Sequence, residues 1–475
     1  MQAIAYRSRA QSFGEYVLTS AIGVLRRRIL SVHADHRRIA KGALIVSLFV
    51  FLGKGTGAFK EMAIAHQYGI GPTVDAYQLA LTLVTLLPYT LTNELCILLV
   101  PLFVRMRDKK DELADFVSEL ETACLLLGVV LTGVLLLVWP GVARIVAGNL
   151  SEQTREMCLH LLAGLTVVGV LSFTNCISAA RLQASGKHIN TLLESVPALV
   201  LLGFILAMPS RNSLLPLMLG TSIGVAAQAL LLHLSARNAD NVRLRLRLSF
   251  RSPHWRDVIR STSVLVFGGV FVTLIPPLDQ YFLAHSGDGA IATYGYAYRV
   301  LALLLGMGAL AISRAILPIL AEILAAKDFV RARDTAFKWS IIMLAVGAAG
   351  AAISWVLAPW IIALLFQRGA FTSEDTVAVT QLFRLGLLQL PFAFAAFVIL
   401  QLLVSEARYR VLAFISIAIF VVKLGGNALL TPRYGAQGVV LATALMAFVN
   451  LLCYFWCLRT PVPEQGEPPR ETATP

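Results

Sequence analysis

Residues 51–61 read Phe-Leu-Gly-Lys-Gly-Thr-Gly-Ala-Phe-Lys-Glu and lie inside the first hydrophobic segment long enough to span a membrane. Two positive charges in this segment come from Lys54 and Lys60. A central charge in a bilayer helix costs about 2.5–3.5 kcal/mol on insertion scales, so it is tolerated mainly where it faces a cavity or a partner. Gly53, Gly55 and Gly57 are expected to loosen the helix beside the charges, since interrupted helices at membrane depth often line transport sites, and Gly55 and Gly57 are candidates for a gating or structural role. The stretch predicts a pathway for an anionic group; the alternative is that both lysines extend to the membrane surface.

The composition is that of a membrane protein. The 475 residues are 57% hydrophobic and 14% charged, whereas soluble domains carry about 25% charged residues. Twelve segments have spanning length, and lipid requires each to be a helix because its backbone must be satisfied internally. We expect them at 42–62, 76–104, 118–147, 156–180, 190–208, 213–235, 258–284, 290–323, 336–366, 378–404, 411–431 and 436–458.

The basic residues lie mostly on one side of these segments. Most of the 40 Lys and Arg residues fall before the first segment, after the last, or in every second loop. By the positive-inside rule both termini are cytoplasmic. The net charge of +13 therefore reflects membrane topology, and we expect no nucleic-acid partner. The predicted organisation is a basic segment 1–41, a helical half 42–235, a basic linker 236–257, a second half 258–458 and a disordered tail 459–475.

A weak internal repeat supports two halves. Val100-Pro101 precedes Lys110-Asp111, and Leu317-Pro318 precedes Lys327-Asp328 at the same spacing. Repeats in the same orientation are typical of transporters whose halves are related by an axis along the membrane normal, with the substrate site between them. We therefore expect two six-helix halves around a central cleft. Chance similarity among apolar helices is the alternative.

Four stretches resemble the MviN/MurJ lipid II flippases, within the superfamily of multidrug, oligosaccharidyl-lipid and polysaccharide exporters. The resemblance covers roughly residues 45–458 and implies a MurJ-like or MATE-like all-helical fold. The stretches are Gly57-Ala-Phe-Lys-Glu-Met-Ala-Ile-Ala65, Tyr296-Ala-Tyr-Arg-Val-Leu301, Leu365-Phe-Gln-Arg-Gly-Ala-Phe371 and Gly435-Ala-Gln-Gly-Val-Val-Leu-Ala-Thr443.

The resemblance also implies site residues. Lys54 and Lys60 stand where the family carries arginines, and Arg299 matches an arginine of its eighth helix; such cations hold the substrate diphosphate. Glu61 and Asp75 match an acidic neighbour and a functional aspartate. Arg368 and Gly369 belong to a loop motif that we expect to be structural.

This chain departs from the family pattern in three ways. It has lysines in place of arginines, and lysine lacks the planar fork that grips phosphate. A further arginine of the second helix has no counterpart, and Glu94 stands in that region, where it could pair with a cleft lysine. The family typically has fourteen helices, whereas twelve are expected here.

The leading hypothesis is a flippase that moves a polyprenyl-diphosphate-linked saccharide, lipid II or an exopolysaccharide unit, from the inner to the outer leaflet of the bacterial cytoplasmic membrane. One alternative is a cation or drug antiporter of the same superfamily, which Glu61, Glu94 and Asp279 keep open. Another is a non-transporting scaffold that docks glycan-assembly enzymes. No HExxH, nucleophile elbow or P-loop occurs, so we expect no enzyme. We also expect no metal or cofactor, membrane lipids as neighbours, and a monomer.

Overall fold

The computed structural model describes residues 34–107, 109–146, 148–187, 189–210, 213–242, 247, 249, 251–252, 254–406 and 408–459. Every regular element in these ranges is an α-helix, which confirms the all-helical prediction. The predictions for segment 1–41 and tail 459–475 lie outside the described residues, except that 34–41 are helical and Arg459 ends the last helix.

Each predicted segment falls on one helix or on two consecutive helices. The linker 236–257 overlaps the end of α9 and the start of α10. The helices are α2 (Ala34–Tyr68), α3 (Pro72–Arg105), α4 (Lys110–Val146), α5 (Glu152–Gly164), α6 (Thr166–Ala184), α7 (Ile189–Leu193), α8 (Val196–Ala207), α9 (Leu215–Asp240), α10 (His254–Thr273), α11 (Ile275–Ala284), α12 (Ala290–Ala325), α13 (Phe329–Phe366), α14 (Ser373–Leu387), α15 (Leu390–Ser405), α16 (Tyr409–Tyr434) and α17 (Ala436–Arg459).

Proline accounts for most of the breaks inside the predicted segments. Pro197, Pro276 and Pro391 stand at the start of α8, α11 and α15, where the missing N–H and fixed φ begin a new helix. The α14–α15 pair bends by 43° and the α5–α6 pair by 44°. By contrast, α2 runs unbroken through Gly55 and Gly57, and the predicted loosening of the helix there stays a prediction. Lipid offers the backbone no other hydrogen-bond partner, which keeps such a helix intact.

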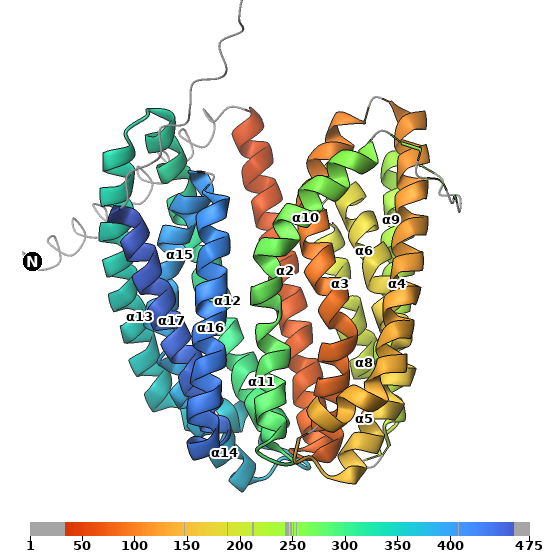
Figure 1. Ribbon diagram of the computed structural model, residues 1–475, viewed down its shortest axis with the longest axis vertical. Coiled ribbons are helices and arrows are strands. Elements are labelled where there is room, and N and C mark those ends of the chain that lie inside the picture. The colour runs from red at the N-terminus through yellow and green to blue at the C-terminus, as the bar shows by residue number, and fades with distance from the viewer. Residues whose placement is uncertain are drawn as a thin grey trace, which may run out of the picture.

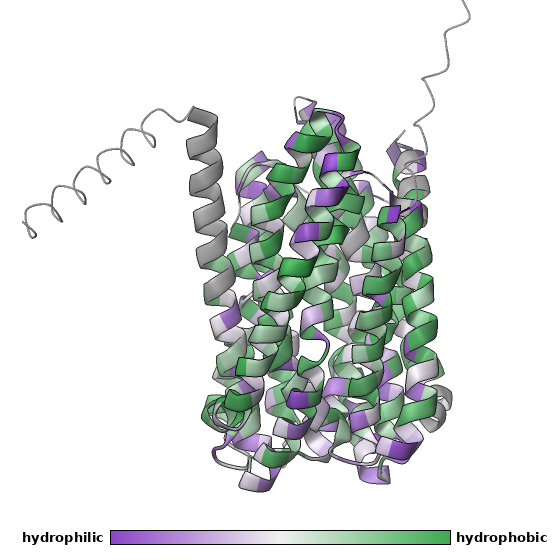
Figure 2. Ribbon diagram, turned by 90° about the vertical axis from the view of Figure 1, so that its left-hand side faces the viewer, coloured by the Kyte–Doolittle hydropathy of each residue, from purple (hydrophilic) through white to green (hydrophobic). Residues whose placement is uncertain are grey.

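The helices form two groups that meet along a central line (Figure 1). The first group is α2 to α9 and the second is α12 to α17, while α10 and α11 contact both α3 and α16. Among the described residues, seven helices are long and apolar enough to cross a membrane, or up to nine if each bent pair is one span. The chain is therefore a multi-pass membrane protein, and the count of twelve spans stays a prediction. Hydrophobic residues dominate the middle of the outer surface in Figure 2.

The two groups are joined at one end of the molecule, which we call the far end and which carries the loops at residues 69–71, 285–289 and 367–372. The Tyr296 hydroxyl on α12 donates to the Gly69 carbonyl at 3.1 Å. The Ala370 amide donates to the His66 carbonyl at 2.8 Å. This end lies at the bottom of Figure 1, away from the start of α2. These hydrogen bonds hold the first and second groups together there.

Candidate functional site

A cavity of about 420 Å³ lies between α2 and α12, with α7 and the end of α13 completing its wall. Lys54, Lys60 and Glu61 enter it from α2, and Arg299 enters it from α12. The structure therefore brings Arg299 together with Lys54 and Lys60, from which it is far apart in the sequence. We call this space the cationic cavity.

Glu61 lies at the centre of the charges in the cationic cavity. Its Oε1 is 2.6 Å from the Lys60 Nζ, and its Oε2 forms an ion pair of 2.8 Å with the Arg299 Nε. Only 7% of Glu61 is exposed, so water screens both pairs weakly. With its amide oxygen turned toward Arg299, Gln78 accepts a hydrogen bond from the guanidinium at 3.2 Å. The Arg299 guanidinium also stands over the Tyr296 ring, 5.8 Å from its centroid.

Lys54 differs from the other two cations because no carboxylate of the described residues lies within ion-pair distance of it. Its side chain is exposed in the cavity. Its Nζ approaches α12, where a Cβ added to Gly306 would lie 3.9 Å away. Glu194 also lines the cavity. The Lys54 ammonium is therefore the one of the three that is open to an incoming anion.

The glycines beside Lys54 have no close neighbours. A Cβ on Gly55 or on Gly57 would meet no atom within 4 Å among those described. Gly57 lines the cationic cavity. Their small size leaves space beside the charges, and their predicted role in gating remains a prediction.

Two predicted features lie at the far end and not in the cavity. Asp75 is fully buried and accepts hydrogen bonds from the amides of Gly289 and Ala292 at the start of α12. Gly369 has φ +64°, and a Cβ there would lie 2.3 Å from the His66 carbonyl oxygen. The neighbouring Arg368 donates to the Leu364 carbonyl. The geometry thus supports the structural interpretation of the Arg368-Gly369 loop and gives Asp75 contacts to backbone amides.

The Glu94 side chain lies outside the described residues, although its backbone belongs to α3. Its predicted pairing with a cleft lysine is untested. Among the described residues, no group of three His, Cys, Asp or Glu side chains is placed to hold a metal ion.

A second buried charge cluster lies in the other half. The fully buried Lys423 on α16 forms an ion pair of 2.8 Å with Asp279 on α11. Asn427 and Tyr294 donate to the same carboxylate at 2.8 and 3.2 Å, and Lys423 donates to the Val439 carbonyl at 2.9 Å. An ionisable residue inside a membrane segment is a candidate functional residue by default. That signal was present in the sequence, but no pattern there indicated that Lys423 and Asp279 neutralise each other.

Glu194 and Gln78 are further residues that sequence reasoning did not place at the site. Glu194 follows the five-residue helix α7 and lines the cationic cavity. In the sequence it stands at the edge of an apolar segment, where a carboxylate is usually a solvated end residue. Only the packing of α7 against α2 turns it toward Lys54.

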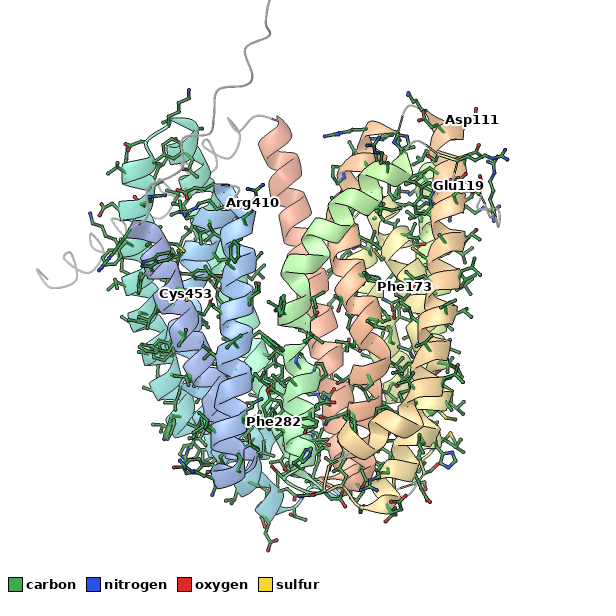
Figure 3. All side chains as sticks on the ribbon, in the orientation of Figure 1. Asp111, Glu119, Phe173, Phe282, Arg410 and Cys453 are labelled. Carbon is green, nitrogen blue, oxygen red and sulfur yellow. The ribbon has the colours of Figure 1, made fainter. Side chains whose placement is uncertain are left out.

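Charged side chains also gather at the end opposite to the far end. Asp111 and Glu119 on α4 and Arg410 on α16 lie toward that end in Figure 3, whereas Phe173 lies within the body of the helices and Phe282 lies nearer the far end. This distribution is typical of a membrane protein whose polar residues mark the water-facing ends.

The family model described as lipid II flippase MurJ matches residues 64–467. A probable lipid II flippase MurJ of Bdellovibrio bacteriovorus is 22% identical over 436 residues, covering 90% of this chain and 83% of the relative. One from Rhizobium meliloti is 25% identical over 448 residues, covering 86% and 80%. The match to the family model contains Asp75 and Arg299 but begins after Lys54 and Lys60.

Solved structures share the fold. A lipid II flippase MurJ in an inward closed conformation superposes with a TM-score of 0.75 at 18% identity and covers 88% of both chains. An inward-facing multidrug resistance MATE family transporter of the MOP superfamily has a TM-score of 0.68 at 14% identity, covering 86% of this chain and 93% of its own. These likenesses confirm the MurJ-like and MATE-like fold. With the family model matching most of its length, this chain belongs to the lipid II flippase MurJ family.

Proposed function

We propose that this protein moves a polyprenyl-diphosphate-linked saccharide from the inner to the outer leaflet of the bacterial cytoplasmic membrane, with both termini on the cytoplasmic side. The substrate is lipid II or a related exopolysaccharide unit. The observation that carries the proposal is the convergence of Lys54, Lys60 and Arg299 on one cavity between the two helix groups. It is supported by membership of a family of flippases.

The charge arrangement suits a diphosphate. A hydrated diphosphate does not enter hydrocarbon unaided, since moving a charge out of water costs several kcal/mol or more. Glu61 pairs with both Lys60 and Arg299, and its single negative charge leaves this group of three with a net positive charge. An incoming diphosphate first meets the open Lys54 ammonium and then competes with Glu61 for the other two cations. Arg299 offers a planar fork for two phosphate oxygens, and the lysines act as point charges.

Alternating access follows from where the two helix groups are joined. The far end is held by hydrogen bonds between the groups, such as Tyr296 to Gly69 and Ala370 to His66. A substrate loaded from the opposite side leaves on the outer side only after these bonds open. We propose a rocking motion of the halves that breaks and remakes them. Because one chain contains both halves, a monomer is sufficient. We propose that membrane lipids surround it and that it works beside glycan-assembly enzymes.

The antiporter alternative is weakened by the state of the acidic groups. Glu61 is paired with Lys60 and Arg299, and Asp279 is paired with Lys423. Neither carboxylate is free to bind a cationic substrate. The scaffold alternative requires no cationic cavity, so it predicts that the cavity residues are dispensable.

Complementation of a bacterium depleted of its own lipid II flippase tests the proposal, with membrane expression verified by blot. Rescue by the wild type and no rescue by the Lys54→Ala, Arg299→Ala variant is the expected result. The matched control is Arg155→Ala, Lys338→Ala, which removes two cations paired at the surface. Rescue by the cavity variant as well as by the wild type would overturn the assigned site but not the transport activity. If a well-expressed wild type does not rescue growth, the substrate is not lipid II, and another lipid-linked glycan becomes the leading candidate.

A further inference from the structure

Two cysteine thiols from different helices meet inside the first helix group. Cys96 on α3 and Cys176 on α6 are both free cysteines, and their sulfur atoms lie 3.0 Å apart. They are 80 residues apart in the sequence, so only the packing of α3 against α6 brings them together. Neither thiol lines the cationic cavity, and the proposed transport step uses neither.

The contacts around the two sulfurs show that the helices cross closely at this point. The Cys96 thiol donates to the Cys176 carbonyl at 3.5 Å, and the Cys176 thiol donates to the Thr92 carbonyl at 3.2 Å. Because Thr92 stands one turn before Cys96, each sulfur reaches the backbone of the opposite helix. A disulfide has its sulfurs about 2 Å apart, so an approach of about 1 Å separates the present thiols from a bond.

Both thiols line a second cavity, of about 600 Å³, which is walled by α3, α6, α8 and α9. This second cavity adjoins the cationic cavity, because Lys60 and Glu194 line both spaces. Cys96 is partly exposed, and Cys176 is 6% exposed. Cysteine reactivity requires access, and fully buried structural cysteines are inert. A small reagent in the second cavity therefore meets Cys96 first and finds Cys176 beside it.

Cys158 on α5 shows what an ordinary packing cysteine looks like in this protein. It is 1% exposed and lines neither cavity. The structure shows no thiol contact for it among the described residues. Cys158 is therefore a matched control for the pair.

A bond between the two thiols would fix part of α3 that follows a proline. Pro88 stands inside α3, roughly two turns before Cys96. A proline inside a helix removes one backbone hydrogen bond, and kinks concentrate at such points. A covalent link from Cys96 to α6 opposes any bending of α3 at Pro88.

We propose that Cys96 and Cys176 form a redox modification site, at which a small disulfide reagent converts the two thiols into one disulfide bond. The Cys96 thiolate attacks one sulfur of the small disulfide and displaces a small thiolate, which takes up the Cys96 proton. The Cys176 sulfur then attacks the Cys96 sulfur and displaces the second small thiolate, which takes up the Cys176 proton. Two protein thiols are oxidised, and one small disulfide is reduced to two thiols. The bond ties α3 to α6 and stops transport until a reductant restores both thiols.

Peptide mapping of the full chain in nanodiscs tests the site with dithiodipyridine, a small uncharged disulfide. After treatment and alkylation by N-ethylmaleimide, we expect a cross-linked peptide that joins Cys96 to Cys176, with loss of two hydrogen atoms and full reversal by dithiothreitol. Cys176→Ser is expected to leave only a mixed adduct on Cys96. Cys158→Ser is expected to keep the cross-link. A wild type in which Cys96 is alkylated, or carries a stable mixed adduct without the cross-link, overturns the inference.

Flipping of a fluorescent lipid II analogue in proteoliposomes tests the consequence. Oxidation is expected to abolish wild-type flipping, and dithiothreitol is expected to restore it, whereas Cys96→Ser, Cys176→Ser keeps flipping in the oxidant. If that variant fails to fold, Cys96→Ala at the partly exposed position serves in its place. Unchanged flipping in the fully cross-linked wild type overturns the effect on transport.

The two arms separate the inference from the proposed function. Formation of the bond is measured without any lipid substrate, and only its effect on transport rests on the proposed function. A wild type that forms the cross-link but flips no lipid II when reduced retains the site and excludes lipid II as the substrate. A wild type that flips lipid II but never forms the cross-link retains the function and overturns the inference.

Discussion

The carboxylate of Asp75 on α3 accepts a hydrogen bond of 2.6 Å from the backbone amide of Ala292 on α12. Its other oxygen accepts one from the amide of Gly289, so one side chain from the first group satisfies the start of a helix of the second. Free amides at a helix N-terminus carry partial positive charge, which favours a carboxylate there. The resemblance implied a functional role for Asp75, and from these two hydrogen bonds we predict that the role is to hold the far end closed.

We predict that Asp75→Ala shifts the protein toward conformations open at the far end. The change leaves two buried amides without a partner, at about 1–3 kcal/mol each. Spin labels at Glu152→Cys and Glu374→Cys, exposed on the two groups at this end, should show a longer mean distance. Asp375→Ala is the control, because Asp375 caps α14 within one group. An unchanged distance with Asp75→Ala would show that this contact does not hold the end closed.

Glu61→Gln is predicted to tighten the binding of a bare polyprenyl diphosphate. The substrate no longer competes with a carboxylate for Lys60 and Arg299, and a hydrogen bond to a charged group contributes about 1.5–3 kcal/mol. This corresponds to roughly tenfold or more in affinity, measured by titration in nanodiscs. Glu152→Gln, at an exposed ion pair, should leave the affinity unchanged. Weaker binding in Glu61→Gln would mean that Glu61 positions the cations instead of competing with the substrate.

The buried pair of Lys423 and Asp279 predicts a non-additive effect on stability. Lys423→Met leaves an uncompensated carboxylate and is expected to destabilise the protein by about 3–5 kcal/mol. Adding Asp279→Asn removes the buried charge and should recover most of the loss. Thermal unfolding in detergent measures both, with Lys338→Met at an exposed ion pair as the control. If the double variant is no more stable than Lys423→Met, the two residues do not act as a pair.

Replacing glycine by alanine is expected to have opposite effects on folding at Gly369 and at Gly55. Gly369→Ala is expected to disrupt the far-end loop, because φ is +64° and the new methyl group would meet the His66 carbonyl. Gly55→Ala is expected to be tolerated, since a Cβ meets no described atom within 4 Å and alanine favours helix by about 1 kcal/mol. Folded yield by size-exclusion chromatography checks both. Loss of transport in a well-folded Gly55→Ala variant would instead support the predicted role of Gly55 in gating.

Sequence reasoning singled out cations that line one cavity in the structure, and their role in binding substrate stays a prediction. Charges such as Lys54 and Arg299 in apolar helices need a cavity or a partner, so they are visible in the sequence as exceptions. The contacts of Glu61 were less visible, because an acidic residue next to Lys60 could face either way around the helix. The helix stays continuous through Gly55 and Gly57 because the backbone needs its internal hydrogen bonds in lipid whatever the local propensity.

The sequence by itself determined the class of molecule, an all-helical membrane protein with two groups of helices. It also showed the resemblance to a family and the cationic segment of α2. These follow from hydrophobic run length, charge and local motifs, which involve neighbouring residues only. The tertiary structure decided that Asp75 fastens α12, that Lys423 neutralises Asp279, and that Glu194 borders two cavities. Such pairings join helices far apart in the sequence, and they depend on which face each helix turns toward its neighbour.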